Sequence, residues 1–146
     1  MRVGLDIHGV ITHNPTFFST LTHLLVSNGH EVHILTGHHG NERIFDKLKL
    51  HNIAYTHFFS VADYRKNQGV AVTYDENNTP WMDEKIWDSA KAEYAAQHKL
   101  DIHIDDTPAY GEYFTTPFML YGVEEIKVQE LLGGKAEETK EVGSVQ

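Results

Sequence analysis

The chain lacks several features that would each define a class of protein. It contains no cysteine, so it has neither disulfide bonds nor zinc sites with thiolate ligands. It has no apolar run long enough to cross a bilayer. Its first apolar segment, Val3–Leu5, is too short for the core of a secretory signal peptide. We therefore expect no membrane association and, by default, a cytoplasmic location.

Basic residues are also few. The 12 Lys and Arg are outnumbered by 21 Asp and Glu, which gives a formal net charge of −9. A general nucleic-acid-binding protein would carry a basic surface, so we expect no nucleic-acid partner. The charge does not exclude a nucleotide substrate, because a metal ion can hold its phosphates.

The length and the apolar content predict one domain with a sizeable core. The chain has 146 residues, of which 40% are hydrophobic, as in ordinary globular proteins. Residues 133–146 are rich in Gly, Lys and Glu and contain almost nothing apolar. We therefore predict a single domain over residues 1–132, followed by a flexible tail.

Short strand-like segments alternate with longer helix-like segments. The expected strands are Val3–Leu5, Glu31–Leu35, Ala54–Val61, Asp101–Ile104 and Phe118–Tyr121. The expected helices begin at Asn14-Pro15, at about Asn41 and at about Asp83. The second should bury Ile44, Phe45 and Leu48. The third should be broken near Asp88-Ser89. Connections of this length predict an α/β fold with a parallel sheet and right-handed crossovers.

Residues 63–80 interrupt this alternation. They contain Gly69, the β-like run Val70–Tyr74 and a polar loop at Asp75-Glu76-Asn77-Asn78. We expect a small insertion here, in the form of a hairpin. Its basic pair, Arg65-Lys66, is interpreted as part of a solvated loop.

Three of the expected strands end in polar residues. Asp6 follows the first strand, Thr36-Gly37 follows the second, and Asp105-Asp106 closes the fourth. Because ligands of open α/β sheets bind beyond the carboxyl ends of the strands, we expect these side chains to meet at one edge. The alternative for Asp6 alone is that it caps a turn with Gly9.

In this order the motifs resemble those of the haloacid dehalogenase superfamily of hydrolases. Asp6-Ile7-His8-Gly9-Val10-Ile11-Thr12 is similar to its first motif, Asp-x-Asp-Gly-(Val/Thr)-x-Thr, except at His8. Thr36 and the pair Asp105-Asp106 are similar to its second and fourth motifs. The resemblance covers about Met1 to Tyr121 and is to small-cap or capless, nucleotidase-like members. It implies a three-layer Rossmann-like fold. The connection lengths, and the need to bring Thr36 and Asp105 to either side of Asp6, predict a sheet in the order third, second, first, fourth, fifth strand.

The acidic residues predict a metal site. Three neighbouring carboxylates raise one another's pKa unless a cation lies between them, and oxygen ligands suit Mg²⁺. The resemblance implies that the side chain of Asp6, the backbone carbonyl of His8 and a carboxylate of Asp105 or Asp106 bind this metal. We favour Asp105 as the direct ligand.

The resemblance also implies a phosphate-binding lysine near the start of the helix before the acidic strand. The strand Asp101–Asp105 advances about 15 Å at about 3.3 Å per residue. A helix that runs back from Lys91 to His98 covers about 12 Å at about 1.5 Å per residue, so Lys91 should lie level with the end of the strand. A helix starting at Lys85 would overshoot by more than a turn. We predict Lys91, which should lower the pKa of Asp6, and keep Lys85 as the alternative.

The function that the resemblance implies is a Mg²⁺-dependent phosphohydrolase. Asp6 would form an aspartyl-phosphate, and Thr36, Gly37 and Lys91 would bind the phosphate of a nucleotide or another small phosphate ester. Phosphatases of this superfamily usually carry an Asp as acid and base at the position of His8, and an imidazole can also transfer protons. Two alternatives are a non-catalytic phosphate- or metal-binding relative and a carbon–halogen or phosphonate hydrolase. An open site would also suit cover by a partner subunit, so a homo-oligomer is left open.

The chain contains eleven histidines, which need separate interpretation. His33 and His103 lie within apolar strands and are interpreted as hydrogen-bonded core residues. His38 and His39 follow Thr36-Gly37 at the expected active edge. A zinc or iron site that combines them with His8 is a less favoured alternative, and His38 as a substrate contact is preferred to it.

Overall fold

The computed structural model describes residues 1–122. Its strands are β1 (Arg2–Leu5), β2 (Glu31–Thr36), β3 (His57–Ser60), β4 (Thr73–Tyr74), β5 (Pro80–Trp81), β6 (Ile102–Asp105) and β7 (Phe118–Leu120). Its helices are α1 (Pro15–Ser27), α2 (Glu42–Leu50), α3 (Val61–Asn67), α4 (Glu84–Gln97) and α5 (Pro108–Gly111), with a helical turn η1 (Ile7–Ile11). The boundary expected at residue 132 and the tail expected at 133–146 lie outside the described residues.

Five parallel strands form the main sheet in the order β3-β2-β1-β6-β7. β1 is central, and its Leu5 pairs with Ile34 on one side and Ile104 on the other. The expected order 3-2-1-4-5 becomes 3-2-1-6-7 because the separate hairpin of β4 and β5 supplies two strands before β6. The architecture is an α/β fold with a parallel, Rossmann-like sheet.

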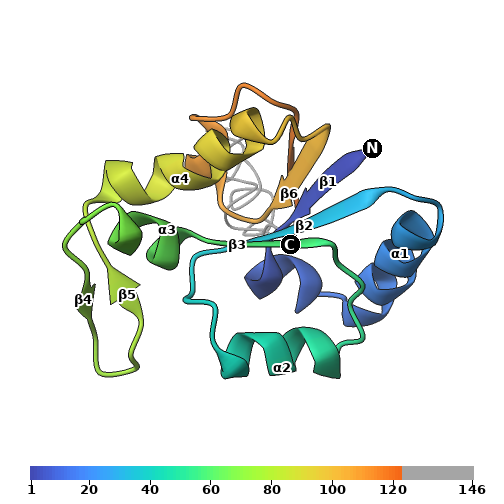
Figure 1. Cartoon of the computed structure of the whole chain (residues 1–146), viewed down its shortest axis with the longest axis horizontal. Coiled ribbons are helices and arrows are strands. Elements are labelled where there is room, and N and C mark those ends of the chain that lie inside the picture. The colour runs from blue at the N-terminus through green and yellow to red at the C-terminus, as the bar shows by residue number, and fades with distance from the viewer. Residues whose placement is uncertain (123–146) are drawn as a thin grey trace, which may run out of the picture.

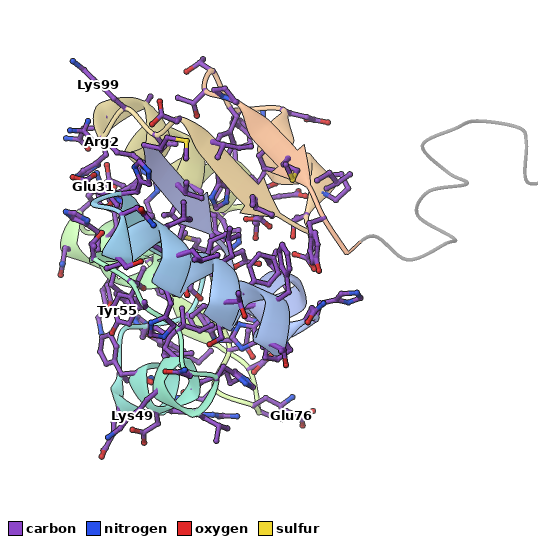
Figure 2. The ribbon with its side chains drawn as sticks, turned by 90° about the vertical axis from the view of Figure 1, so that its right-hand side faces the viewer. Arg2, Glu31, Lys49, Tyr55, Glu76 and Lys99 are labelled. Atoms are coloured by element: carbon purple, nitrogen blue, oxygen red, sulfur yellow. The ribbon has the colours of Figure 1, made fainter. Side chains whose placement is uncertain are left out.

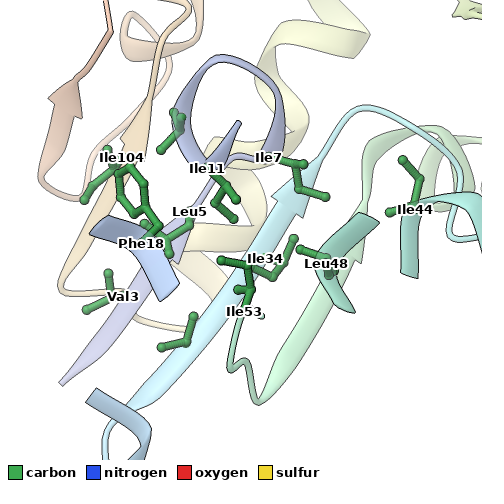
Figure 3. Close-up of a cluster of buried hydrophobic side chains, with 12 residues drawn as sticks. Val3, Leu5, Ile7, Ile11, Phe18, Ile34, Ile44, Leu48, Ile53 and Ile104 are labelled. Carbon is green, nitrogen blue, oxygen red and sulfur yellow. The ribbon is translucent and has the colours of Figure 1, made fainter. Parts of the chain in front are cut away.

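Helices cover both faces of the sheet (Figure 1). On one face, α1 and α2 bury Phe18, Ile44 and Leu48 against the apolar strand residues, as Figure 3 shows. On the other face, α3 and α4 bury a second cluster that includes Leu35 and Tyr94. The strand residues alternate between these two clusters, because successive side chains of a strand point to opposite faces. The polar strand ends are thereby carried on a sheet that is buried on both sides.

The helix caps follow the sequence signals. The side chain of Asn14 accepts from the Phe17 N–H, with Pro15 at the first helical position of α1. The side chain of Asn41 accepts from the Ile44 N–H at the start of α2. Phe45, which we expected to be buried, is 39% exposed. It lies at the edge of the helix face, where its ring packs on Phe58.

The expected insertion begins later than predicted. The strand expected over Ala54–Val61 is limited to His57–Ser60, and residues 61–67 form α3, because Ser60 caps the helix and Val61 and Ala62 are buried. Arg65 is only 7% exposed, so its interpretation as part of a solvated loop is wrong. The excursion is confined to the segment around the β4–β5 hairpin, which extends away from the sheet beside α3 (Figure 1).

The helix before β6 is continuous. We expected a break near Asp88-Ser89, but α4 runs from Glu84 to Gln97 without interruption. The Ser89 hydroxyl donates to the carbonyl of Lys85 one turn earlier, which satisfies it inside the helix. Among residues 1–122, no helix is long and apolar enough to cross a membrane.

Candidate active site

Asp6 directly follows β1 and begins the turn η1. Its backbone N–H donates to the carbonyl of Ile104 at 3.1 Å, which continues the pairing of β1 with β6. Gly9 in this turn has a φ of +83°, a conformation that favours glycine. A Cβ on Gly9 would lie 2.0 Å from Oδ2 of Asp106. Glycine at this position therefore allows the acidic pair to approach the turn that carries Asp6.

Lys91 lies between two carboxylates. Its Nζ donates to Oδ1 of Asp6 at 3.0 Å and to Oδ2 of Asp105 at 2.7 Å. The side chain comes from α4 and is almost fully buried, whereas Lys85 on the same helix is exposed. Lys91 rather than Lys85 therefore reaches the end of β1, as the helix-length argument predicts.

The two carboxylates that share Lys91 have opposite pKa shifts. Burial raises the pKa of Asp6 to about 7, because loss of hydration outweighs the attraction of Lys91, and the charge of Asp105 adds to the shift. Burial alone would also raise the pKa of Asp105, but Lys91 and His103 outweigh it and hold this pKa well below its usual range. Lys91 lowers the pKa of Asp6 as we expected, but burial has the larger effect, so the pKa of Asp6 is raised overall.

The two carboxylates of the acidic pair, Asp105 and Asp106, differ in how many hydrogen bonds they make. Oδ2 of Asp105 accepts from Lys91 and is bonded to Nε2 of His103 at 2.9 Å, and Oδ1 accepts from the Thr107 N–H at 3.2 Å. Asp106 is only partly buried, and among residues 1–122 its single hydrogen bond is from the Thr107 hydroxyl to Oδ1. Asp106 therefore has more capacity for a further ligand than Asp105, contrary to our preference for Asp105.

The carboxylates fit a divalent cation. One oxygen from each of Asp6, Asp105 and Asp106 can be chosen so that all three lie within 4.8 Å of one another. Such a cluster of hard oxygen donors suits Mg²⁺. A second group within residues 1–122, formed by Glu31, His33 and His57, includes two imidazoles and suits zinc better. It lies toward the opposite end of the sheet, since Glu31 begins β2 and shares one end of the molecule with Arg2 and Lys99 (Figure 2).

Thr36 closes β2 at the same edge as Asp6. Its side chain is fully buried, and its hydroxyl accepts from the His38 N–H at 3.3 Å. A Cβ on Gly37 would lie 2.4 Å from the Trp87 ring, so glycine allows that ring to cover the strand end. A cavity of about 160 Å³ results, which is lined by Asp6, His8, Thr36, Gly37, His38, Trp87, Lys91, Thr107 and Tyr110.

His8 lines this cavity, but its imidazole has a basic partner. Nζ of Lys47 on α2 donates to Nε2 of His8 at 2.9 Å. Burial lowers the pKa of His8 to about 4, and the charge of Lys47 adds to the shift. At neutral pH the imidazole is therefore uncharged, and its Nε2 is an acceptor rather than a proton donor.

Two of the other histidines, His33 and His103, are hydrogen-bonded core residues, as predicted from the sequence. His33 bonds to the Tyr94 hydroxyl and to Glu31, and the fully buried His103 bonds to Asp105, so both are core residues with polar partners. The His38 ring packs against that of His8, with 4.5 Å between centroids.

His39 has polar partners of its own. It contacts Asp63 and the Tyr74 hydroxyl. The clusters of metal-ligating side chains within residues 1–122 therefore do not include His8, His38 or His39, and a zinc or iron site built from them is not supported.

Three contributors to the site were not identified from the sequence. Tyr110 places its ring 5.0 Å from Nζ of Lys91 and accepts from the Trp87 indole N–H at 2.8 Å. Lys47 lies on α2, and the sequence does not show which residues of this helix face the end of β1. His103 could have been found, because residues two apart on a strand share a face and Asp105 is its neighbour at that spacing.

Comparisons with protein-family models, with curated proteins and with solved structures found no match. The resemblance to the haloacid dehalogenase superfamily therefore rests on the motifs of this chain and on the arrangement of its strand ends.

Proposed function

We propose that the chain is a magnesium-dependent phosphohydrolase that acts through an aspartyl-phosphate on Asp6. The observation that carries the proposal is the buried ammonium of Lys91, which bridges Asp6 and Asp105 at the carboxyl end of the sheet. The adjoining cavity of about 160 Å³ is large enough for a phosphoryl group and is lined by the Thr36 hydroxyl. The substrate class that we propose is a nucleotide or another small phosphate ester.

The residues of the chain have separate roles in this reaction. A carboxylate oxygen of Asp6 attacks phosphorus, and the bond to the leaving oxygen breaks, so that this oxygen departs with the electron pair. Water then hydrolyses the aspartyl-phosphate, which releases phosphate and restores the carboxylate. Lys91 and the Thr36 hydroxyl provide fixed positive charge and a hydrogen bond for the developing negative charge.

The donor set of the site fits Mg²⁺. Asp6 and Asp106 would hold the ion through their free oxygens, together with the His8 backbone carbonyl that the resemblance implies, while Asp105 keeps Lys91 in place. When bound, Mg²⁺ would neutralise the carboxylates, keep Asp6 ionised at neutral pH and accept a phosphate oxygen as a ligand.

The proposal is tested by hydrolysis of a generic aryl phosphate in the presence of Mg²⁺. Asp6→Asn should abolish turnover, and Lys91→Ala should lower kcat by about 10²-fold or more, the usual cost of losing a fixed electrostatic partner. Lys85→Ala is the matched control, since Lys85 is exposed on the same helix, and it should leave kcat unchanged. Unchanged turnover in Asp6→Asn would exclude Asp6 as the nucleophile.

A second candidate is a phosphate-binding relative without turnover. The neutral imidazole of His8, whose Nε2 accepts from Lys47, favours it, because the leaving oxygen then lacks a proton donor at this position. His8→Asp would restore the usual acid of the superfamily. A positioned general acid contributes about 10²–10⁴-fold, so His8→Asp should raise the hydrolysis of alkyl phosphates, whose leaving groups are poor, by at least about tenfold.

Aryl phosphates with good leaving groups need no proton and are the internal control for this substitution. If wild type hydrolyses no phosphate ester and His8→Asp does, the phosphate-binding relative is the better description. If His8→Asp gains nothing on alkyl phosphates, the missing proton donor is not what limits the reaction.

A further inference from the structure

A second pocket adjoins the phosphoryl cavity. Its volume is about 240 Å³, and it shares His8 and His38 with the cavity that contains Asp6 and Lys91. One wall comes from α2, through Arg43 and Lys47. The opposite wall comes from the β4–β5 hairpin, through residues 77–80.

The polar lining of this pocket is basic or neutral. Arg43 and Lys47 line it together with three histidines and three asparagines, and no carboxylate is among the lining residues. This is unusual for a chain with a net charge of −9. Arg43 and Lys47 therefore give this pocket a positive charge on a protein that is acidic as a whole.

The two cations have little else to bind. Within residues 1–122, Arg43 has neither an ion pair nor a hydrogen bond through its guanidinium, and the one polar partner of Lys47 is His8. Arg43 is exposed and Lys47 is half-buried, so both are accessible to a ligand in the pocket.

The opposite wall is held in place by its own hydrogen bonds. Oδ1 of Asp75 accepts from the backbone N–H groups of Asn77 and Thr79, both at 2.9 Å. Its Oδ2 accepts from the Trp81 indole N–H at 3.2 Å. These hydrogen bonds fix the backbone of the loop, which lines the pocket with Asn77 and Asn78, and side-chain amides can donate to an oxyanion.

We propose that this pocket binds a second anionic group of the substrate, so that the substrate class is a phosphate ester that also carries a phosphate or a carboxylate. Arg43 would bind the second oxyanion through its planar fork and Lys47 as a point charge. The first phosphoryl group would occupy the cavity beside Asp6. The inference rests on the proposed function only in placing the first phosphoryl group beside Asp6.

The test is a binding measurement by titration calorimetry at fixed Mg²⁺ concentration. Methylenebisphosphonate and phosphonoacetate, which carry two anionic groups, are compared with methylphosphonate, which carries one. Wild type should bind both doubly anionic probes more tightly than methylphosphonate. Arg43→Gln should weaken their binding by about tenfold or more, the cost of one charge-assisted hydrogen bond, and should leave methylphosphonate binding unchanged.

Lys49→Gln is the matched control. Lys49 lies on the same helix as Arg43, is absent from the pocket lining and points away from the molecule (Figure 2). The substitution removes the same charge, so a general electrostatic effect would weaken binding equally in both variants. Because chelation of Mg²⁺ by the probes is common to both variants, it cancels in the comparison.

The outcomes separate this inference from the proposed phosphohydrolase. Binding that depends on Arg43 in a protein that hydrolyses no ester would support the second anion site and count against the phosphohydrolase. Equal binding of singly and doubly anionic probes, no binding of either, or equal losses in Arg43→Gln and Lys49→Gln would each overturn the inference, whatever the result with aryl phosphates. Weak binding of phosphonoacetate beside tight binding of methylenebisphosphonate would assign the site to phosphate rather than carboxylate.

Discussion

The raised pKa of Asp6 has a consequence for stability. Its pKa is about 7 in the folded chain, whereas an unperturbed Asp titrates at about 3.9. Between these values the unfolded chain releases a proton that the folded chain keeps. The contribution of Asp6 to folding stability therefore falls as pH rises from about 4 to about 7, and this loss is on the order of a few kcal/mol.

Asp6→Asn removes this titration and isolates its effect. Without divalent ions, the free energy of unfolding of Asp6→Asn relative to wild type should rise between pH 4.5 and pH 7.5. Urea unfolding at the two pH values measures the difference, in which the histidines common to both proteins largely cancel. A constant difference between the two proteins would mean that Asp6 titrates normally.

The positions of several site residues were predictable from the sequence, but the protonation of Asp6 was not. Asp6, Thr36 and Asp105 were predictable because each follows an apolar strand, and parallel strands bring such ends to one edge. The protonation of Asp6 was not predictable, because it depends on how completely the carboxylate is buried and on how Lys91 divides its charge. Both are properties of packing rather than of spacing along the chain.

At the scale of elements, the buried side chain of Arg65 connects α3 to α4. Nε of Arg65 donates to the carbonyl of Ile86 at 2.9 Å, and an N–H of its guanidinium donates to the Ser89 hydroxyl at 3.1 Å. Its ion pair with Glu93 is 3.0 Å long but half-exposed on the acidic side, and contributes little. Arg65→Ala should therefore lower the free energy of unfolding by about 2–3 kcal/mol through the lost hydrogen bonds and the polar groups left unpaired.

Lys66→Ala is the natural control for this prediction. Lys66 is the neighbouring basic residue and is exposed, so its loss should change the free energy of unfolding by no more than about 0.5 kcal/mol. Urea denaturation of the two variants compares them directly. Equal effects of the two substitutions would show that Arg65 contributes no more than surface charge.

Helices and strands that depend on local signals were predicted correctly, whereas those that depend on tertiary contacts were not. Asn14-Pro15 and Asn41 marked helix starts that the structure confirms, since capping is a local interaction. The helix over residues 61–67 was missed because it depends on burying Val61 and Arg65 against α4. Ile86 of α4, whose carbonyl accepts from Arg65, lies 21 residues further along the chain than Arg65. The uninterrupted α4 is a second case, because packing of Ala90 and Tyr94 outweighs the weak local break at Ser89.

For the whole molecule, the order of the main sheet followed from connection lengths and from the requirement that Thr36 and Asp105 flank Asp6. The hairpin of β4 and β5 was recognisable as an excursion, but its position beside α2 was not, because no periodic pattern relates the two segments. The pocket of Arg43 and Lys47 therefore arises at a junction that only the folded chain creates. The second anion site that we propose lies at this junction and could not be predicted from the sequence alone.

A metal ion should stabilise the whole fold by binding the clustered carboxylates. A ligand that binds the folded state at about 100 times its Kd adds about 2.7 kcal/mol of stability. For a chain of this size, that increment corresponds to a rise in Tm of about 5–10 °C. Saturating Mg²⁺ should produce such a rise at pH 7.5 in differential scanning calorimetry, because Asp6, Asp105 and Asp106 are brought together only in the folded chain.

The dependence on individual carboxylates locates the ion. Asp6→Asn and Asp106→Asn should each lose most of the response to Mg²⁺, since these are the carboxylates with free oxygens. Glu31→Gln is the matched control, because it removes a carboxylate from the other cluster, which contains His33 and His57 and is better suited to zinc. Its Tm should respond to Mg²⁺ as that of wild type does. A wild-type Tm indifferent to Mg²⁺ and other divalent ions would count against a metal site at this edge, and a response lost in Glu31→Gln alone would move the site to the opposite end of the sheet.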